Sequence, residues 1–272
     1  MYTTRGLPMS LAHAEGGAAL LRLAVRAAHR AGELLLEGAA AGPPEVRTKS
    51  SAKDLVTAFD RGSEACVVEI LTAARPDDGI LGEEGGERPG GSGVRWVIDP
   101  LDGTANFVSG YPAFVVSIAA ERAGRTEVGV VYDPSRRETF TAIRGRGAAR
   151  DGLPLTVSGA ERLEQALVST GFSSDPATRD RQAALAARVV ARVRDIRSSG
   201  SAALDLCWVA AGRLDAYYES GTRLWDRAAG ALIAEEAGAW VGGADGRPPC
   251  DAMTIACAPK TADALRALVG HA

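Results

Sequence analysis

The sequence predicts a mixed fold of the α/β (α+β) class in which the two halves of the chain are organised differently. Apolar runs separated by short turns indicate an antiparallel meander in the first half, with strands over residues 94–98, 114–120, 127–132 and 138–143. In the second half, predicted strands and helices alternate, a pattern typical of α/β units. We therefore expect two sub-domains, residues 1–150 and residues 151–272.

Two amphipathic helices precede the predicted meander. Apolar residues recur at helical spacing over residues 17–36, which predicts the first helix. The segment 41–54 is expected to form a loop and a short strand. A second helix is predicted to begin near Phe59 and to end before Pro76, which places Asp60 in its first turn.

The second half alternates between the two element types. Strands are predicted over residues 166–169, 214–218 and 253–258. Helices are predicted over residues 178–192, 201–211, 226–237 and from residue 261 onward. This alternation is the basis for placing a separate sub-domain after the meander.

Composition and charge narrow the classes of function. Of the 272 residues, 46% are hydrophobic, so the chain can bury one large core or two modest cores that share an interface. Its 31 basic and 34 acidic residues are interspersed, which argues against nucleic acid or an anionic membrane as a partner. No stretch offers the roughly 20 apolar residues of a membrane span, and the N-terminus lacks a leader pattern. We expect a cytoplasmic protein that acts on small molecules.

Cysteine and histidine are not expected to carry the chemistry. The four cysteines lack CxxC spacing, so reduced and mostly buried thiols are expected. The three histidines, His13, His29 and His271, lie in or near the terminal helical segments and are expected at the surface. A hydrolase with a Ser/His or Cys/His nucleophile is therefore disfavoured.

An acidic corner follows the first strand of the predicted meander. Pro100 lacks a backbone donor and disfavours helical geometry at Asp99, while Gly103 permits a sharp turn. Asp99 and Asp102 can then point to one spot. Two carboxylates held together repel one another unless they share a proton or a cation, and oxygen-only ligands favour a hard ion such as Mg²⁺. The alternative is that both are Asx-turn residues that close an ordinary loop.

Two further acidic positions lie at the ends of predicted elements. Glu83 and Glu84 follow a short apolar strand and stand between glycines, and Asp226 begins a predicted helix. Taken singly, the glutamates could belong to a solvated loop and Asp226 could be an N-cap. Acids at three separate element ends together favour a shared site.

These motifs resemble those of the inositol monophosphatase family, which comprises Mg²⁺-dependent, lithium-sensitive sugar phosphatases. The resemblance rests on GEEGG, on DPLDGT followed by NF, and on WD followed by AAG. The segments Lys49–Asp60 and Arg197–Glu219 are also similar to family motifs, and all of them occur in the family's order over most of the chain. The resemblance implies a layered αβαβα sandwich with an antiparallel N-terminal sheet and a mixed C-terminal sheet, usually in a homodimer.

The resemblance also implies a set of metal ligands. Glu83, Asp99 and the backbone carbonyl of Leu101 would hold a first Mg²⁺. A second would be held by Asp99, Asp102 and Asp226, and a third, weaker ion would lie near Glu83. Most of these ligands lie in the N-terminal sub-domain, whereas Asp226 comes from the C-terminal one. Two such metals can clamp the attacking and leaving oxygens of an in-line displacement at phosphorus.

Catalytic and phosphate-binding roles follow from the same resemblance. Thr104 would align the nucleophilic water, with its hydroxyl oriented by Asp60. The backbone N–H groups of Gly103 and Thr104 would face the phosphate if they open a helix. Lys49 is the nearest candidate cation, although it could equally be a solvated loop lysine. Glu84 would lie behind the neighbouring metal ligand.

Other residues are assigned to the alcohol side of the substrate. The resemblance implies contacts from Asp102, Gly200, Ser201, Ala202, Glu219 and Asp226. For Glu219, the alternative is a strand-end acid in water. Arg227 stands where the family commonly has an aliphatic residue, and as a cation in the first turn it opposes the helix dipole. It would either contact substrate or pair with a surface acid.

The sequence thus predicts an inositol-1-monophosphatase-like enzyme. It would hydrolyse myo-inositol 1-phosphate or a similar sugar or polyol phosphate, with two or three Mg²⁺ ions in the active site. Histidinol phosphate, fructose 1,6-bisphosphate and 3′-phosphoadenosine 5′-phosphate are alternative substrates, because the segment after Val168 does not align with the family's inositol-contacting loop. A regulatory binding protein on the same fold is the non-enzymatic alternative. Catalysis is favoured because every expected ligand position carries the expected residue type.

Overall fold

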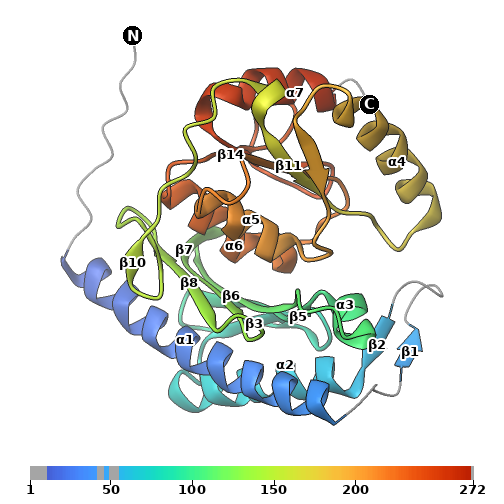
Figure 1. The fold of residues 1–272 in the computed structure, drawn as a ribbon. Coiled ribbons are helices and arrows are strands. Elements are labelled where there is room, and N and C mark those ends of the chain that lie inside the picture. Colours follow the sequence, from blue (N-terminus) through green and yellow to red (C-terminus); the bar gives the residue numbers. More distant parts are fainter. Residues whose placement is uncertain (1–10, 42–45, 49–54, 271–272) are drawn as a thin grey trace.

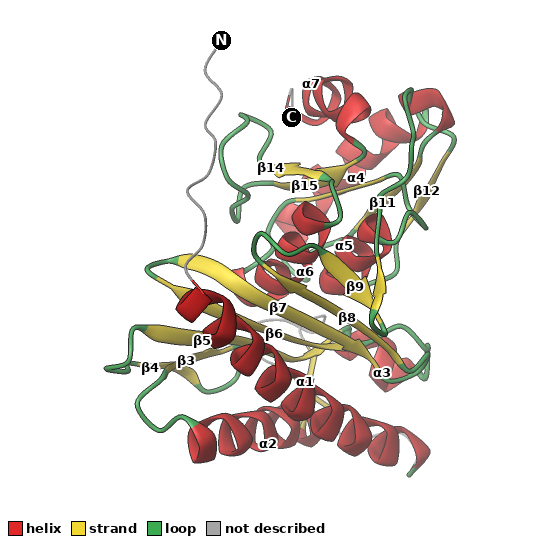
Figure 2. Ribbon diagram, turned by 90° about the vertical axis from the view of Figure 1, so that its left-hand side faces the viewer, coloured by secondary structure: helices red, strands yellow, loops and turns green. Residues whose placement is uncertain are grey.

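The fold is given by a computed structural model that describes residues 11–41, 46–48 and 55–270. The two larger β-sheets lie one above the other with helices between them (Figure 1). Further helices cover the outer face of each sheet, so the layers alternate in the order αβαβα (Figures 1 and 2). The predicted layered sandwich is confirmed.

The N-terminal sheet has eight strands in the order β10-β9-β8-β7-β6-β5-β3-β4. Their bounds are β3 Gly79–Gly82, β4 Gly86–Arg88, β5 Val94–Asp102, β6 Val115–Arg122, β7 Arg125–Asp133, β8 Glu138–Ile143, β9 Ala148–Arg150 and β10 Leu153–Pro154. All neighbouring strands are antiparallel except β3 and β5. These two run parallel because the chain turns back through β4 on the outer side of β3 before it enters β5. The prediction of an antiparallel sheet is wrong for this pair alone.

Helices pack on both faces of this sheet. The outer face is covered by α1 (Leu11–Ala40) and α2 (Ala58–Ala74), and the inner face by α6 (Leu224–Glu236) and, less extensively, α5 (Ala202–Ala210). Side chains of a strand alternate between its two faces. Accordingly, Trp96 and Ile98 of β5 are buried in one cluster with α1, whereas Val97 is buried in another with α5 and α6.

The C-terminal sheet has five strands in the order β12-β11-β13-β15-β14. Their bounds are β11 Leu167–Thr170, β12 Asp195–Arg197, β13 Ala216–Glu219, β14 Trp240–Gly242 and β15 Thr254–Cys257. Strand β11 is parallel to β12 and β13, whereas β15 is antiparallel to β13 and β14, so the sheet is mixed as predicted. Its outer face packs against α4 (Pro176–Val190) and α7 (Ala262–Gly270).

The central helices belong to the cores of both halves. Tyr217 of β13 and Val131 of β7 lie in the same buried cluster, on opposite sides of α5 and α6. Gly129 of β7 allows α6 to approach closely, because a Cβ at this position would lie 2.8 Å from the carbonyl oxygen of Ala229. The two sheets therefore share one apolar layer, which holds their strand ends in a fixed relation.

The remaining described elements are short. They are β1 Val46–Thr48, β2 Leu55–Thr57, α3 Thr104–Ser109 and the 3₁₀ turns Leu163–Gln165 and Pro259–Thr261. Several predicted boundaries differ from the structure. Strand β5 continues to Asp102 rather than ending at Ile98, α6 begins at Leu224 rather than at Asp226, and α1 spans Leu11–Ala40 rather than residues 17–36. The extension of β5 contains a register shift between Asp99 and Asp102, so the acidic corner is a bulge in a strand.

His29 differs from its predicted surface position. Its Nε2 lies 2.8 Å from Thr139 Oγ1, and its ring packs against Tyr132 at 4.4 Å between centroids. The side chain is half-buried because α1 lies across the outer face of the sheet at this point. The side chains of His13 and His271 lie outside the described part of the structure.

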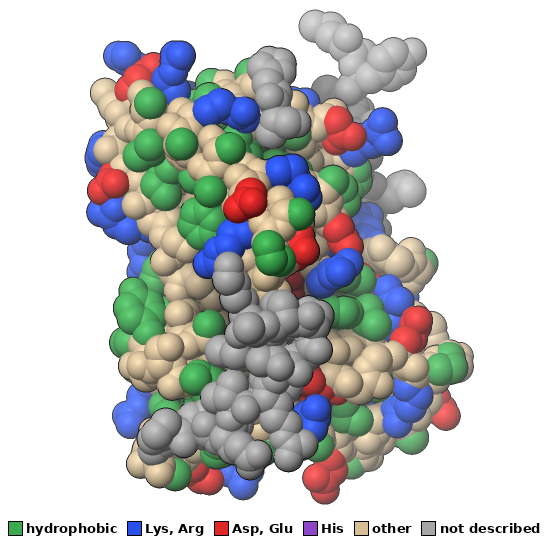
Figure 3. Space-filling model, turned by 90° about the vertical axis from the view of Figure 1, so that its right-hand side faces the viewer, with side chains coloured by type: hydrophobic (Ala, Val, Ile, Leu, Met, Phe, Trp, Pro, Cys, Tyr) green, Lys and Arg blue, Asp and Glu red, His purple; other side chains and the backbone are tan. Residues whose placement is uncertain are grey.

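The surface carries both signs of charge. On the face shown in Figure 3, basic and acidic side chains are interspersed among apolar and neutral ones. None of the described helices is both long enough and apolar enough to cross a membrane.

Candidate active site

A cavity of about 180 Å³ lies where the strand ends of the two sheets meet. Its walls are formed by Glu83, Asp99, Leu101, Asp102, Gly103, Thr104, Gly171, Phe172, Gly200, Ser201, Ala202, Glu219 and Asp226. All the predicted metal ligands and all the predicted alcohol-side residues are among them. The structure therefore brings together side chains that are far apart in the sequence, and it places the acids in one enclosure rather than on separate patches of the surface.

The bulge in β5 positions Asp99. Its carboxyl is buried, and Oδ1 accepts a hydrogen bond from the backbone N–H of Leu101 at 3.1 Å. The bulge is attached to α2 because Ser63 Oγ donates to the carbonyl of Pro100 at 2.8 Å. This arrangement contains an Asx-like local contact, so the loop-closing alternative describes part of the geometry. It does not account for the burial of Asp99 beside other acids.

Thr104 and Asp60 form the predicted pair. Thr104 Oγ1 lies 2.9 Å from Asp60 Oδ1 and 3.1 Å from the carbonyl oxygen of Leu101, so its hydroxyl can donate to either acceptor. Asp60 Oδ2 accepts from both the backbone N–H and the hydroxyl of Thr57, each at 2.7 Å. Asp60 is therefore fixed by the first turn of α2. It lies behind Thr104 and does not line the cavity.

A turn with special backbone geometry precedes Thr104. Gly103 has a φ of 102°, which disfavours residues with a Cβ, and an added Cβ would also lie 2.8 Å from the carbonyl oxygen of Ala113. Thr104 then begins α3. The predicted helix start is present, but α3 has only six residues, so its dipole is small.

Asp102 joins the two halves of the molecule at the cavity. Its Oδ2 accepts from Ser201 Oγ at 2.8 Å and from the backbone N–H of Ala203 at 2.7 Å, where α5 begins. A second link is made by Asn106, whose Nδ2 donates to the carbonyls of Ala113 at 2.6 Å and Ser199 at 2.7 Å. The segment around residue 200 is therefore held against the N-terminal sheet.

Asp226 faces the cavity from the first turn of α6. Its Oδ2 accepts from the backbone N–H of Arg223 at 2.7 Å, so it also supports the helix start, although not from the N-cap position. Arg227 points elsewhere: it donates to the carbonyl of Thr222 at 2.5 Å and pairs with Asp251 at 2.9 Å. Of the two roles considered for Arg227, pairing with a surface acid matches this geometry.

Glu219 ends β13 against the loop that follows β11. Tyr217 donates from its hydroxyl to Glu219 Oε2 at 2.8 Å. Gly171 packs directly on this carboxyl, because a Cβ added there would collide with it. Burial raises the pKa of Glu219 to about 8. Glu219 is partly buried in the cavity wall and bonded to Tyr217, which differs from a fully solvated strand-end acid.

The glycine-rich loop after β3 is held by a buried acid. Glu64 accepts from the backbone N–H groups of Glu84 at 2.9 Å and Gly85 at 2.6 Å. Glu83 faces the acidic cavity, whereas Glu84 lines a neighbouring cavity beside Glu64. The proposed place of Glu84 behind the neighbouring metal ligand stays a prediction. Lys49 lies outside the described residues.

The acids of the cavity destabilise one another's charged forms. Burial raises the pKa of Asp99 well above its ordinary value, and the charges of Glu83, Asp102 and Asp226 raise it further. Burial also raises the pKa of Asp102, and it raises that of Asp226 to about 8. A positive charge in the cavity would favour the ionised forms of all these groups.

The donor chemistry fits a hard divalent cation, because carboxylate and carbonyl oxygens are the ligands that Mg²⁺ and Ca²⁺ prefer. The side chains are not yet arranged as a coordination shell. Within the described ranges, no group of three or more acidic, histidine or cysteine side chains has a geometry that could hold a metal ion. Asp102 and Asp226 each direct one oxygen to a local N–H group.

Gly171 and Phe172 were missed by the sequence interpretation. They immediately follow β11 and line the cavity, where Gly171 packs on the carboxyl of Glu219. The predicted strand over residues 166–169 was the available signal, because ligand sites gather at strand ends in α/β sheets. An apolar Phe172 side chain gives no chemical hint of this position.

Comparisons with known proteins agree with the geometry. Residues 18–270 match the model of the inositol monophosphatase family. A Mycobacterium tuberculosis protein named inositol-1-monophosphatase SuhB is 47% identical, over 83% of this chain and 81% of the relative. A Pasteurella multocida protein named Nus factor SuhB is 46% identical, over 82% and 84% respectively. The crystal structure of extragenic suppressor protein suhB from Bartonella henselae has a TM-score of 0.88 and 38% identity, covering 92% of this chain and 98% of that one.

Proposed function

Because this chain belongs to the inositol monophosphatase family, a family of phosphatases, we propose that it is a Mg²⁺-dependent phosphomonoesterase. Its substrate is myo-inositol 1-phosphate or a similar sugar or polyol phosphate. The observation that supports this most strongly is the gathering of five acids in one cavity, where Thr104, the partner of Asp60, also lines the wall. A binding protein would have no need to bury acids that repel one another.

The metal-binding residues in this proposal are Glu83, Asp99, Asp102, Asp226 and the carbonyl of Leu101, which together would hold two or three Mg²⁺ ions. When bound, Mg²⁺ supplies Lewis-acid stabilisation of charge on the phosphate oxygens and lowers the pKa of a water ligand. Neither cysteine nor histidine lines the cavity among the described residues, so the proposed chemistry uses oxygen donors throughout.

The chain's own contribution to water attack is made by Thr104. Donation of its hydroxyl proton to Asp60 would leave the Oγ1 lone pairs available to accept a proton from a water in the cavity. Two hydrogen bonds from Thr57 fix Asp60, so the acceptor that faces the Thr104 hydroxyl is held in place before substrate binds. This is the positioning that general-base assistance requires.

The substrate would lie between the two sheets. The backbone N–H groups of Gly103 and Thr104 are the proposed donors to the phosphate, since the first N–H groups of a helix lack intrahelical partners. On the alcohol side, Glu219 and the backbone over residues 200–202 are the proposed partners of ring hydroxyls, with Asp102 and Asp226 within reach. The small cavity volume favours a compact polyol.

Substrate choice is tested by hydrolysis rates at fixed Mg²⁺. The panel contains myo-inositol 1-phosphate, histidinol phosphate, fructose 1,6-bisphosphate and 3′-phosphoadenosine 5′-phosphate. The proposal expects the highest kcat/KM with inositol phosphate. A clear preference for the bisphosphorylated nucleotide would overturn it. Lithium inhibition, a cytoplasmic location and a homodimeric assembly belong to the same proposal.

A regulatory binding role is the second candidate. One close relative carries the name Nus factor SuhB, so a relative on this fold is named for a role other than hydrolysis. The two roles are compatible. A chain without phosphatase activity on any member of the panel, at any Mg²⁺ concentration, would favour the regulatory role alone.

A further inference from the structure

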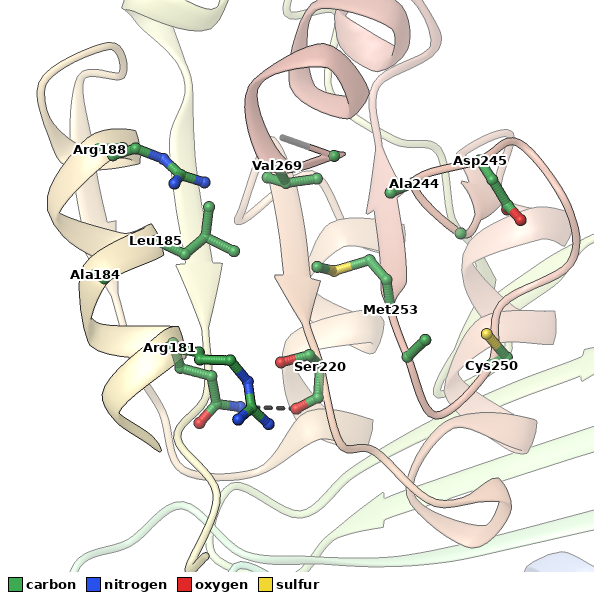
Figure 4. A pocket seen from close by; sticks show the side chains of 14 residues that line it. Arg181, Ala184, Leu185, Arg188, Ser220, Ala244, Asp245, Cys250, Met253 and Val269 are labelled. Carbon is green, nitrogen blue, oxygen red and sulfur yellow. Dashed lines mark hydrogen bonds between the residues drawn. The ribbon is translucent and has the colours of Figure 1, made fainter. Parts of the chain in front are cut away.

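A buried amide connects two walls of the proposed catalytic cavity from behind. Gln182 lies on α4, and its side chain is 5% exposed. Its Oε1 accepts from the backbone N–H of Ser173 at 2.6 Å, and its Nε2 donates to the carbonyl of Ser220 at 2.7 Å. Figure 4 shows the second of these bonds, which ends at Ser220. Both polar ends of the amide are thus used.

The two partners of Gln182 adjoin cavity residues. Ser173 follows Phe172, and Ser220 follows Glu219. Phe172 and Glu219 both line the proposed catalytic cavity, Phe172 from the loop after β11 and Glu219 from the end of β13. Gln182 therefore spans the two strand ends that form the proposed alcohol side of the site.

Only one orientation of the amide satisfies both contacts. Ser173 offers an N–H group, which needs an acceptor, and Ser220 offers a carbonyl, which needs a donor. Arg179, on the same helix, adds a third attachment by donating to the carbonyl of Ser173 at 3.2 Å and lying over the Phe172 ring at 5.9 Å. Helix α4 thus holds the loop after β11 from several points.

We propose that Gln182 is a positioning residue that sets the spacing between Phe172 and Glu219, and through it the affinity of the site for the polyol part of the substrate. The inference rests on the proposed phosphatase function. It goes beyond that function because Gln182 touches neither the cavity nor the acids in it. Replacing Gln182 should therefore change KM and leave metal binding unchanged.

The surroundings of Gln182 allow this to be tested without unfolding the protein. A second cavity, of about 470 Å³, lies beside it between α4 and the C-terminal sheet. In Figure 4, Leu185 faces Met253 and Val269 across this space. A side chain of similar length can therefore replace Gln182 with little overpacking.

The first variant is Gln182→Met, which keeps length and removes both hydrogen bonds. We expect KM for myo-inositol 1-phosphate to rise about tenfold, since two net hydrogen bonds are lost, while kcat and the Mg²⁺ concentration for half-maximal rate change less than about twofold. The control is Ala183→Ser on the exposed side of α4, which should change none of these. An unchanged KM in a folded Gln182→Met protein would overturn the proposal.

The second variant, Gln182→Glu, can form both hydrogen bonds again when its carboxyl is protonated. A neutral carboxylic acid can accept from Ser173 and donate to Ser220, whereas a carboxylate cannot donate. The ratio of its KM to that of the wild type should therefore be large at pH 8 and should approach one as the pH is lowered. A ratio independent of pH would contradict the role assigned to the Nε2 donor.

Hydrogen exchange does not depend on enzyme activity, so it tests this inference separately from the proposed function. Hydrogen exchange in Gln182→Met should accelerate in peptides covering residues 171–175 and 219–222, but not in those covering 82–86 and 101–106. An inactive wild type with this exchange pattern would reject the phosphatase proposal and retain the link between the two strand ends. Unchanged exchange would reject the link itself.

Discussion

Thr104 Oγ1 lies 2.9 Å from Asp60 Oδ1, although the two residues are 44 positions apart. One opens the short helix after the β5 bulge, and the other caps the long helix that covers the outer face of the sheet. The contact joins the acidic corner at the end of β5 to helix α2. The first two predictions concern this contact.

Replacing Thr104 with alanine should remove the aligned proton acceptor without removing any proposed metal ligand. We expect kcat to fall by about 10²–10⁴-fold, the usual contribution of a positioned acid or base. Steady-state rates and Mg²⁺ titrations of Thr104→Ala measure both effects. Thr104→Ser, which keeps the hydroxyl, is the matched control and should retain most of the rate. Unchanged turnover in Thr104→Ala would remove this residue from the mechanism.

Asp60→Asn should act through the same hydroxyl. Because Thr104 and Asp60 work as a unit, the double variant Asp60→Asn/Thr104→Ala should be hardly slower than Thr104→Ala alone. A double-mutant cycle in kcat measures this coupling. Multiplicative losses would show instead that the two residues act independently.

Asp226→Asn separates helix support from catalysis. Asparagine retains a side-chain oxygen that can accept from the Arg223 N–H group, so the start of α6 should persist. Loss of the carboxylate should nevertheless reduce turnover by at least about 10²-fold, because a ligand charge is removed from the proposed metal site. Wild-type turnover and Mg²⁺ dependence in this variant would identify Asp226 as a helix-start residue only.

For the same variant, we expect a pH-dependent change in the free energy of unfolding when no metal is bound. The pKa of Asp226 is raised from 3.8 to about 8 in the folded protein, chiefly by burial. The folded state therefore holds this proton more tightly, and the contribution of Asp226 to the free energy of unfolding falls as the pH rises between these values. In EDTA, Asp226→Asn should gain stability over the wild type, more at pH 8 than at pH 5, in urea titrations. A difference that shrinks with rising pH would contradict the shift.

Gly171→Ala tests the close contact behind Glu219. The added Cβ would collide with the Glu219 carboxyl, so either the loop or the acid must move. We expect a KM increase of about 10-fold or more, since small displacements in a site are costly. Gly91→Ala, where nothing lies within 4 Å of an added Cβ, is the control and should behave as the wild type. Equal KM values in the two variants would contradict the assigned role of Glu219.

Local rules were sufficient to predict part of this site. Pro100 and Gly103 restrict the backbone so strongly that a turn carrying Asp99 and Asp102 could be expected from the sequence. The same rules ended the strand too early, at Ile98, because a bulge extends β5 through the acids to Asp102. Bulges depend on the partner strand, which a local pattern does not contain.

The contacts between residues far apart in the chain were harder to predict from the sequence. Glu219 could be connected to the acidic corner only through the family resemblance. Asp226 offered one further signal, because it begins a predicted helix and acids at several element ends favour a shared site. Phe172 and Gln182 were missed because an apolar ring and a neutral amide have no distinctive spacing. The short strands β9, β10, β12 and β14 have only two or three residues, too few for a period to be recognised.

The central claim is that buried acids converge to hold the cations that hydrolysis needs. Its most direct test is a crystal soaked in Mn²⁺, a Mg²⁺ substitute visible by anomalous scattering. The claim predicts at least two anomalous peaks in the cavity, with Asp99 contacting both and Asp226 contacting one. A cavity without peaks at saturating Mn²⁺, in crystals whose dissolved protein is active, would contradict it.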